Sequence, residues 1–238
     1  VKDVTLLAKL EYFNPAGSTK DRAALSMIED AEERGIIKED TIIVEPTSGN
    51  QGIGLALVGA VRGYRTIIIM PDSVSEERRK LVRHYGAEVQ LIHDAGDIGE
   101  CIDECLKTAL RMAKKDKNVF VPQQFANINN VKAHKNHTAL EIMEQVAGPI
   151  DGFCSGIGTG GTITGTGEYL KDMNPAVEII GMEPAASPFL SKGEAGPHGI
   201  QGIGAGFAPS ILNQNIYDEI VTIEDDKAIE CGKLIGTE

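Results

Sequence analysis

Short apolar runs rich in Ile and Val alternate with segments of helical periodicity, and this alternation restricts the fold more than any other feature of the chain. The expected strands are TIIVE (41–45), TIIIM (66–70) and EVQLI (88–92), and the helices expected after them span about 50–62, 75–85 and 98–114. Continuous apolar strands separated by helices are typical of a parallel sheet that is covered on both faces. The sequence therefore predicts an α/β fold.

A second series of the same kind follows the Asn- and Gln-rich segment QQFANINN (123–130), where we expect the chain to pass into another domain. DGFCS (151–155) and VEIIGME (177–183) are expected strands, and a helix near 162–171 is expected between them. The stretch 184–215 is rich in Gly and Pro and shows little periodicity. Loops of that length in compact domains usually serve a function.

The acidic balance of the chain limits the classes of partner. The 238 residues include 23 Lys and Arg against 35 Asp and Glu, a formal net charge of −12, which argues against nucleic acid. No run approaches the roughly 20 apolar residues of a membrane helix, and the first residues do not resemble a signal peptide. We expect a cytoplasmic protein with no membrane partner.

The four cysteines, Cys101, Cys105, Cys154 and Cys231, form no CxxC pair. Cys101 and Cys105 share one face of an expected helix, but neither has a His or carboxylate at a typical ligand spacing. Because lone cysteines most often pack as small apolar residues, we expect free thiols and no metal site.

A strand end followed by a polar turn, EPTSGNQGIGLAL (45–57), is the strongest single feature. Such a turn directs free backbone N–H groups and the positive end of the helix dipole towards a carboxylate or phosphate. Thr47, Ser48 and Asn50 add hydroxyl and amide groups. The same residue types also cap ordinary helices, so the turn alone leaves both interpretations open.

A second turn, SGIGTGGTITG (155–165), suits a phosphate held by clustered backbone amides. It also matches G-x-G-x-x-G through Gly156, Gly158 and Gly161, and Glu183 lies near the position of a ribose-binding acid. A nicotinamide-dependent dehydrogenase is therefore an alternative from another class. The glycine density of GTGGT exceeds what that fingerprint requires, and the turn comes late in the chain.

Lys20 follows the turn NPAGS and opens an expected helix that runs through 23–34. A lysine in the first turn of a helix faces the positive helix end, which favours the neutral amine. A neutral amine is the form needed for Schiff-base chemistry. Composition alone favours the alternative, in which Lys20 is one solvated surface lysine among many.

Five segments in one order resemble the cysteine synthases (O-acetylserine sulfhydrylases), which belong to the fold-type II pyridoxal-phosphate enzymes. They are NPAGSTKDR, PTSGNQG, PQQFAN, GIGTGGTITG and IQGIGAGFAP, and the resemblance runs from about Leu10 to Glu238. It implies two three-layer α/β domains of the tryptophan synthase beta-like kind, with mostly parallel sheets and the cofactor in the interdomain cleft. The smaller domain would span 14–127, and the larger would combine 1–13 with 128–238, incomplete at both ends.

The resemblance also implies roles for individual residues. Lys20 matches the Schiff-base lysine and Asn50 matches the asparagine at the ring hydroxyl of pyridoxal phosphate. Thr47, Ser48, Gln51 and Gln124 match contacts to the substrate carboxylate. The residues that match the phosphate-binding loop are Gly158, Thr159, Gly160, Gly161 and Thr162, and the segment 202–206 resembles a loop at the mouth of the site.

The implied reaction replaces the acetoxy group of O-acetyl-L-serine with sulfide and yields L-cysteine and acetate. The family implies a homodimer that binds the C-terminal tail of serine acetyltransferase. Gln51 departs from the usual TSGNTG, and no residue up to Glu238 matches the serine at the pyridine nitrogen, so we expect a piece of a longer chain. Cystathionine β-synthase, a serine or threonine dehydratase and a non-catalytic regulator of this fold are the alternatives.

Overall fold

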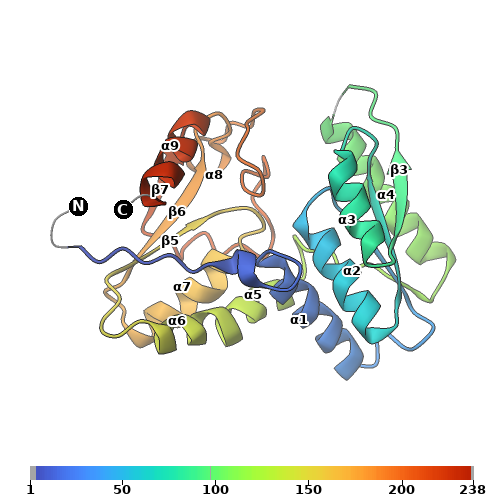
Figure 1. Cartoon of the computed structure of the whole chain (residues 1–238), viewed down its shortest axis with the longest axis horizontal. Coiled ribbons are helices and arrows are strands. Elements are labelled where there is room, and N and C mark those ends of the chain that lie inside the picture. Colours follow the sequence, from blue (N-terminus) through green and yellow to red (C-terminus); the bar gives the residue numbers. More distant parts are fainter. Residues whose placement is uncertain (1–3, 97, 237–238) are drawn as a thin grey trace. The chain divides into compact units, whose positions relative to one another are not determined.

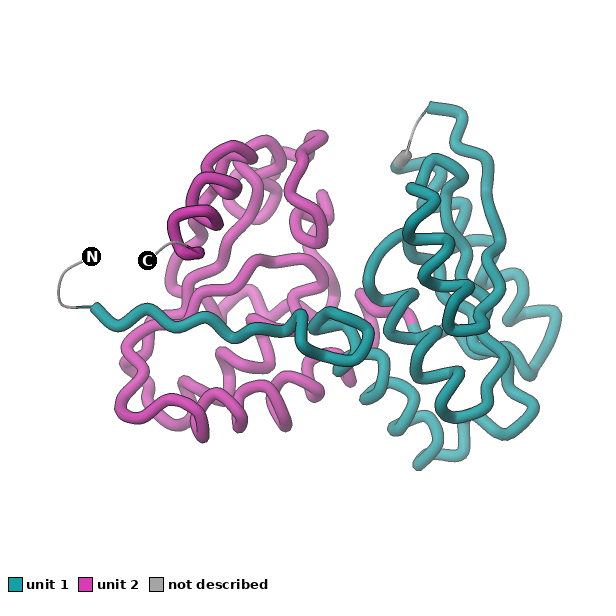
Figure 2. The backbone as a smooth tube through the Cα atoms, viewed as in Figure 1, with its two compact units in different colours: residues 1–122 teal, residues 123–238 magenta. Residues whose placement is uncertain are grey.

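The computed structural model describes residues 4–96 and 98–236. The chain divides into two compact units, unit 1 (1–122) and unit 2 (123–238), drawn in different colours in Figure 2. The expected domain bounds, 14–127 for one domain and 1–13 with 128–238 for the other, stay a prediction.

Unit 1 contains a four-stranded parallel sheet in the order β3-β2-β1-β4 (Figure 1). Its elements are η1 (Glu11–Phe13), α1 (Lys20–Glu33), β1 (Ile42–Pro46), α2 (Asn50–Arg62), β2 (Arg65–Pro71), α3 (Glu76–His84), β3 (Glu88–Ile92), α4 (Ile98–Lys115) and β4 (Val119–Phe120). The alternating strands and helices predicted between residues 41 and 114 are all present, and the helix predicted at 50–62 has the same bounds.

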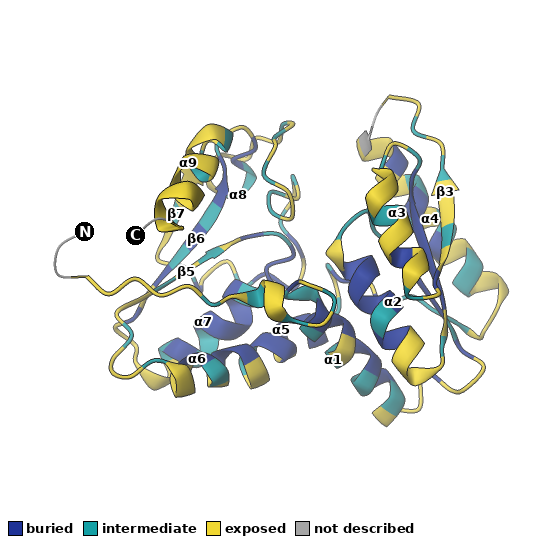
Figure 3. Ribbon diagram, in the orientation of Figure 1, coloured by how far each residue is buried: buried dark blue, intermediate teal, exposed yellow. Residues whose placement is uncertain are grey.

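Successive residues of the unit 1 strands supply two separate cores. Ile43 and Ile68 pack in a cluster with residues of α1, α2 and α3. The next residue of β1, Val44, packs with Ile67 of β2 and with α4. Side chains of a strand alternate between the faces of its sheet, so both faces of β1 and β2 are covered. The edge strand β3 is mostly exposed and appears yellow in Figure 3.

Unit 2 contains a three-stranded parallel sheet in the order β5-β6-β7. Its elements are α5 (Asn129–Ala133), the π-helical turn η2 (His134–Thr138), α6 (Ala139–Gln145), β5 (Gly152–Gly156), α7 (Gly161–Met173), β6 (Glu178–Pro184), α8 (Phe189–Lys192), β7 (Glu219–Ile223) and α9 (Asp225–Ile235). Ile163 and Leu170 of α7 pack against Ile179 of β6 in its core. The stretch 184–215 holds one short helix, as its lack of periodicity predicts.

All four cysteines are free thiols, as predicted, and two of them are buried. Cys101 and Cys105 are buried in α4, and burial raises the pKa of the Cys105 thiol to about 12. Cys154 and Cys231 are exposed instead. Among residues 4–96 and 98–236, no three His, Cys, Asp or Glu side chains gather as metal ligands would, and no helix there could cross a membrane.

We expect Gly59→Ala to destabilise unit 1. A Cβ at position 59 of α2 would overlap the hydroxyl of Thr66 and lie 3.3 Å from the carbonyl oxygen of Tyr64. Overpacking of this kind lowers the free energy of unfolding by about 1–3 kcal/mol. Urea unfolding measures it, with Gly232→Ala as the control, because a Cβ at position 232 meets nothing within 4 Å. Equal stability of the two variants would contradict the close packing.

Candidate functional site

In unit 1, Lys20 and the TSGN turn are held together by the packing of α2 on α1. A Cβ at position 54 would lie 3.0 Å from the carbonyl oxygen of Lys20, so the helices approach this closely only because residue 54 is glycine. Lys20 is the first residue of α1 and is partly buried. Desolvation by burial lowers the pKa of its amine, which favours the neutral form that a nucleophile or base requires.

The TSGN turn connects β1 to α2 and is held from both sides. The amide of Thr47 donates to the carbonyl oxygen of Ile69 at 3.0 Å. The guanidinium of Arg78 in α3 donates to the carbonyl oxygen of Ser48 at 3.0 Å. Asn50 is exposed at the start of α2, and the N-cap residue, Gly49, has no capping side chain. Since no side chain caps this end, its N–H groups suit an anionic ligand, which favours binding over the capping interpretation.

Gln51 differs from its neighbours in the turn because its side chain is buried. Its side chain is 1 % exposed, and the amide nitrogen donates to the sulfur of Met27 in α1 at 3.7 Å. Its amide oxygen is buried and has no partner among the described residues. Its expected contact with a substrate carboxylate stays a prediction.

In unit 2, the glycine-rich turn joins β5 to α7 and is supported by α5 and η2. Asn130 of α5 donates to the hydroxyl oxygen of Thr159 at 2.8 Å. The Nε2 atom of His134 lies 3.3 Å from the hydroxyl oxygen of Thr162. Gly160 caps α7 with a φ of 84°, which only glycine adopts readily, and a Cβ at Gly161 would overlap Asn130. Because the first N–H groups of a helix have no acceptor within the helix, the start of α7 suits a phosphate.

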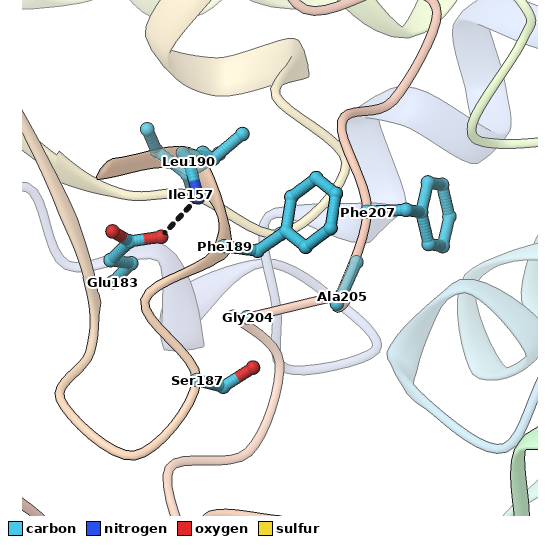
Figure 4. A pocket seen from close by; sticks show the side chains of 10 residues that line it. Ile157, Glu183, Ser187, Phe189, Leu190, Gly204, Ala205 and Phe207 are labelled. Atoms are coloured by element: carbon cyan, nitrogen blue, oxygen red, sulfur yellow. Dashed lines mark hydrogen bonds between the residues drawn. The ribbon is translucent and has the colours of Figure 1, made fainter. Parts of the chain in front are cut away.

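The loop at 202–206 lies against the same turn. The amide of Gly204 donates to the carbonyl oxygen of Ile157 at 2.9 Å, and a Cβ at Gly158 would overlap the carbonyl oxygen of Gly202. Figure 4 shows a small pocket beside this loop, and Phe189 and Phe207 are among the residues that line it. Two of the five motifs, GIGTGGTITG and IQGIGAGFAP, therefore lie together within unit 2.

Glu183 does not act as a ribose-binding acid in this arrangement. It is 2 % exposed, and its carboxylate accepts a hydrogen bond from the amide of Leu190 at 2.9 Å (Figure 4). It also accepts one from the amide of Ser191 at 3.0 Å. These bonds hold the start of α8. The carboxylate is committed to the protein's own backbone, which removes the residue on which the dinucleotide alternative depends.

Gln124 directly follows a residue in an unusual backbone conformation. Gln123 has a φ of 58° and is the only non-glycine residue with a positive φ in the described part of the chain. Gln124 is 8 % exposed, and its carbonyl oxygen accepts a hydrogen bond from Asn130 at 3.0 Å. Backbone conformations of this kind cost free energy and occur often at functional sites. The expected carboxylate contact of Gln124 stays a prediction.

The sequence did not indicate three residues that support these turns. Arg78, Asn130 and His134 each form a hydrogen bond to a turn that lies far away in the sequence but within the same unit. The Asn-rich composition of 123–130 was the only signal for Asn130, and it was interpreted as a domain crossing. No local pattern distinguishes Arg78 or His134 from other polar residues on helices.

We expect Gln51→Leu to raise the free energy of unfolding by about 1 kcal/mol, because it removes a buried amide oxygen without a partner. Urea unfolding measures the change. Gln90→Leu is the matched control, since residue 90 is exposed and the same substitution there removes no buried polar atom. A Gln51→Leu variant less stable than the parent would show that the amide is satisfied in solution.

Comparisons with known proteins agree with this geometry. The family model described as "Pyridoxal-phosphate dependent enzyme" matches residues 2–238. A cysteine synthase from Staphylococcus aureus is 48% identical over 234 residues, which cover 97% of this chain and 73% of the relative.

Two solved structures show the same fold. A hydrogen sulfide-producing enzyme from Fusobacterium nucleatum has a TM-score of 0.90 at 46% identity and covers 97% of this chain and 75% of its own. An O-acetylserine dependent cystathionine beta-synthase from Helicobacter pylori has a TM-score of 0.86 at 38% identity, with 94% and 71% covered. The predicted fold class, that of the fold-type II enzymes, is confirmed. The chain belongs to the family of pyridoxal-phosphate dependent enzymes.

Proposed function

We propose that this chain is a cysteine synthase that replaces the acetoxy group of O-acetyl-L-serine with sulfide and releases L-cysteine and acetate. The observation that carries the proposal is the amine of Lys20, whose pKa is lowered where α1 packs against α2 and its TSGN turn. The cysteine synthase of S. aureus, at 48% identity over 97% of this chain, supports the same reaction.

The residues present fit pyridoxal phosphate. Lys20 would hold the cofactor's aldehyde carbon, and Asn50, exposed at the start of α2, would bind the ring hydroxyl. The phosphate would be bound by the loop from Gly158 to Thr162 with the first amides of α7. Gly160 and Gly161 leave the space in that loop that a Cβ would occupy. When bound, the cofactor supplies an electron sink for the carbanion formed at the substrate's α-carbon.

Lys20 then acts as the base. A neutral Nζ accepts the α-proton of O-acetylserine, and the resulting ammonium returns the proton to that carbon after sulfide has added to the β-carbon and acetate has left. The TSGN turn, with Gln51 and with Gln124, would bind the carboxylate so that the α C–H bond points at Lys20. A low pKa matters because a protonated Lys20 has no lone pair for this step.

The proposal also specifies the two substrates, O-acetylserine as the acyl donor and sulfide as the sulfur donor. The F. nucleatum relative is described as producing hydrogen sulfide and the H. pylori relative as a cystathionine beta-synthase that depends on O-acetylserine. Cystathionine β-synthase-like chemistry therefore stays the alternative. Product analysis with O-acetylserine and either sulfide or homocysteine separates the two reactions, because one yields cysteine and the other cystathionine.

The assembly expected from the family is also a proposal. A homodimer and a complex with the C-terminal tail of serine acetyltransferase fit this function, since a turn that binds a substrate carboxylate can bind a peptide's terminal carboxylate. We also place the reaction in the cytoplasm, because all four cysteines are free thiols.

We expect Lys20→Ala to abolish the cofactor's visible absorption band and to slow β-replacement by about 10²–10⁴-fold. Spectra and cysteine formation measure the two effects. Lys80→Ala, which removes an exposed lysine of α3, is the control and should change neither. Borohydride reduction followed by peptide mapping that placed the cofactor on another lysine would exclude Lys20.

We expect Arg78→Met to weaken substrate binding while the cofactor stays bound, because the TSGN turn loses its tie to α3. A hydrogen bond from a charged donor contributes about 1.5–3 kcal/mol, so KM for O-acetylserine should rise roughly tenfold or more. Steady-state kinetics and the cofactor's absorbance measure these effects. Arg83→Met, an exposed position of the same helix, is the matched control. An unchanged KM would show that the turn keeps its shape without Arg78.

A further inference from the structure

We propose that Asn130 and His134 are positioning residues that occupy acceptor positions of both threonine hydroxyls in the glycine-rich turn and direct their protons to the ligand, so that the turn favours a fully deprotonated phosphate. The inference rests on the proposed function only in taking pyridoxal phosphate as the ligand. Both residues come from the α5 and η2 segment of unit 2, and both are 1 % exposed.

Thr159 has its acceptor capacity filled by the protein. Its hydroxyl oxygen accepts from Nδ2 of Asn130 at 2.8 Å and from the amide of Gly161 at 3.4 Å. A hydroxyl group has two lone pairs and one proton, so only the proton remains for another partner. Among the described residues, the hydroxyl of Thr159 accepts these two bonds and donates none. The hydroxyl of Thr159 is therefore left to donate to a ligand.

The orientation of the Asn130 amide is fixed by its two acceptors. Nδ2 also donates to the carbonyl oxygen of Gln124 at 3.0 Å, so its two protons are both used. A flipped amide would place an oxygen against the carbonyl oxygen of Gln124, so the bond to Gln124 fixes the amide with Nδ2 facing Thr159. A Cβ at Gly161 would overlap the Asn130 side chain, which explains why the turn has glycine there.

His134 acts in the same way on Thr162. Its Nδ1 lies 3.0 Å from the hydroxyl oxygen of Thr138, and its Nε2 lies 3.3 Å from that of Thr162. In this proposal Thr138 donates to Nδ1, which leaves the ring proton on Nε2 to be donated to Thr162. The hydroxyl proton of Thr162 is then left for a ligand. The π-helical turn that places Thr138 beside His134 is rare and occurs most often at functional sites.

Together the two hydroxyls and the first amides of α7 present donors to one ligand. A phosphate dianion has only acceptor oxygens and matches such a surface, whereas a protonated phosphate directs an O–H at donors. The second ionisation of a phosphate monoester has a pKa of about 6. Affinity should therefore increase as the pH rises through this value.

The test uses cofactor-free protein and measures the dissociation constants of pyridoxal phosphate and inorganic phosphate between pH 5 and 8. Asn130→Asp replaces the donor at Thr159 by an acceptor, and we expect it to weaken both ligands at least about tenfold at pH 7. Asn174→Asp is the matched control, because Asn174 is exposed and its Oδ1 only accepts from the amide of Ala176, which a carboxylate also does. Melting temperatures verify that both variants are folded.

The tautomer of His134 is read separately by nitrogen NMR of protein labelled at histidine, with the signal assigned from its loss in His134→Gln. A proton on Nε2 is expected. A proton on Nδ1, or unchanged phosphate affinity in a folded Asn130→Asp variant, would overturn the proposal. Cysteine formation by the parent protein is measured separately. If phosphate binds as expected but no cysteine forms, the proposed function fails and the role of Asn130 and His134 stands.

Discussion

The close approach of α2 to the first turn of α1 is the contact on which the unit 1 part of the site depends. A Cβ at Gly54 would lie 3.0 Å from the carbonyl oxygen of Lys20 and 3.2 Å from the Cβ of Ala24. Because the helices meet through small residues, the amine of Lys20 and the TSGN turn are held by backbone packing. A lysine on a flexible loop would be solvated and protonated, whereas this position desolvates the amine.

In unit 2 the backbone also shapes the site, although the residues differ. Parallel strands place their carboxyl ends on one edge, where the helix that follows begins with unpaired N–H groups. In both units a glycine lies where the strand passes into that helix, Gly49 before α2 and Gly160 before α7. Backbone amides can hold an anion without basic side chains, which explains how a chain with a net charge of −12 can bind a phosphate.

Sequence reasoning succeeded where the pattern is local and failed where it depends on tertiary contacts. The periodicity of α2 and the glycine-rich turn before α7 are local signals. The helix starts that they predict, near 50 and 162, lie within a residue of the observed starts. The π-helical turn η2 follows an Asn-rich segment, and its partner Thr162 is 28 residues from His134. The direction of the Gln51 side chain depends on Met27, which belongs to another helix. Propensity carries no information about such pairs.

Two local features that lower the stability of the fold lie in, or directly beside, residues proposed to bind the substrate. Gln51 buries an amide oxygen without a partner, and Gln123, next to Gln124, has a φ of 58°. Neither helps the fold, because an apolar residue at 51 or a glycine at 123 would remove the cost. Strain and unsatisfied polar groups persist where the surrounding structure enforces them, and they concentrate at binding sites. Their positions in TSGNQG and QQF therefore favour a binding role for both segments over a purely structural one.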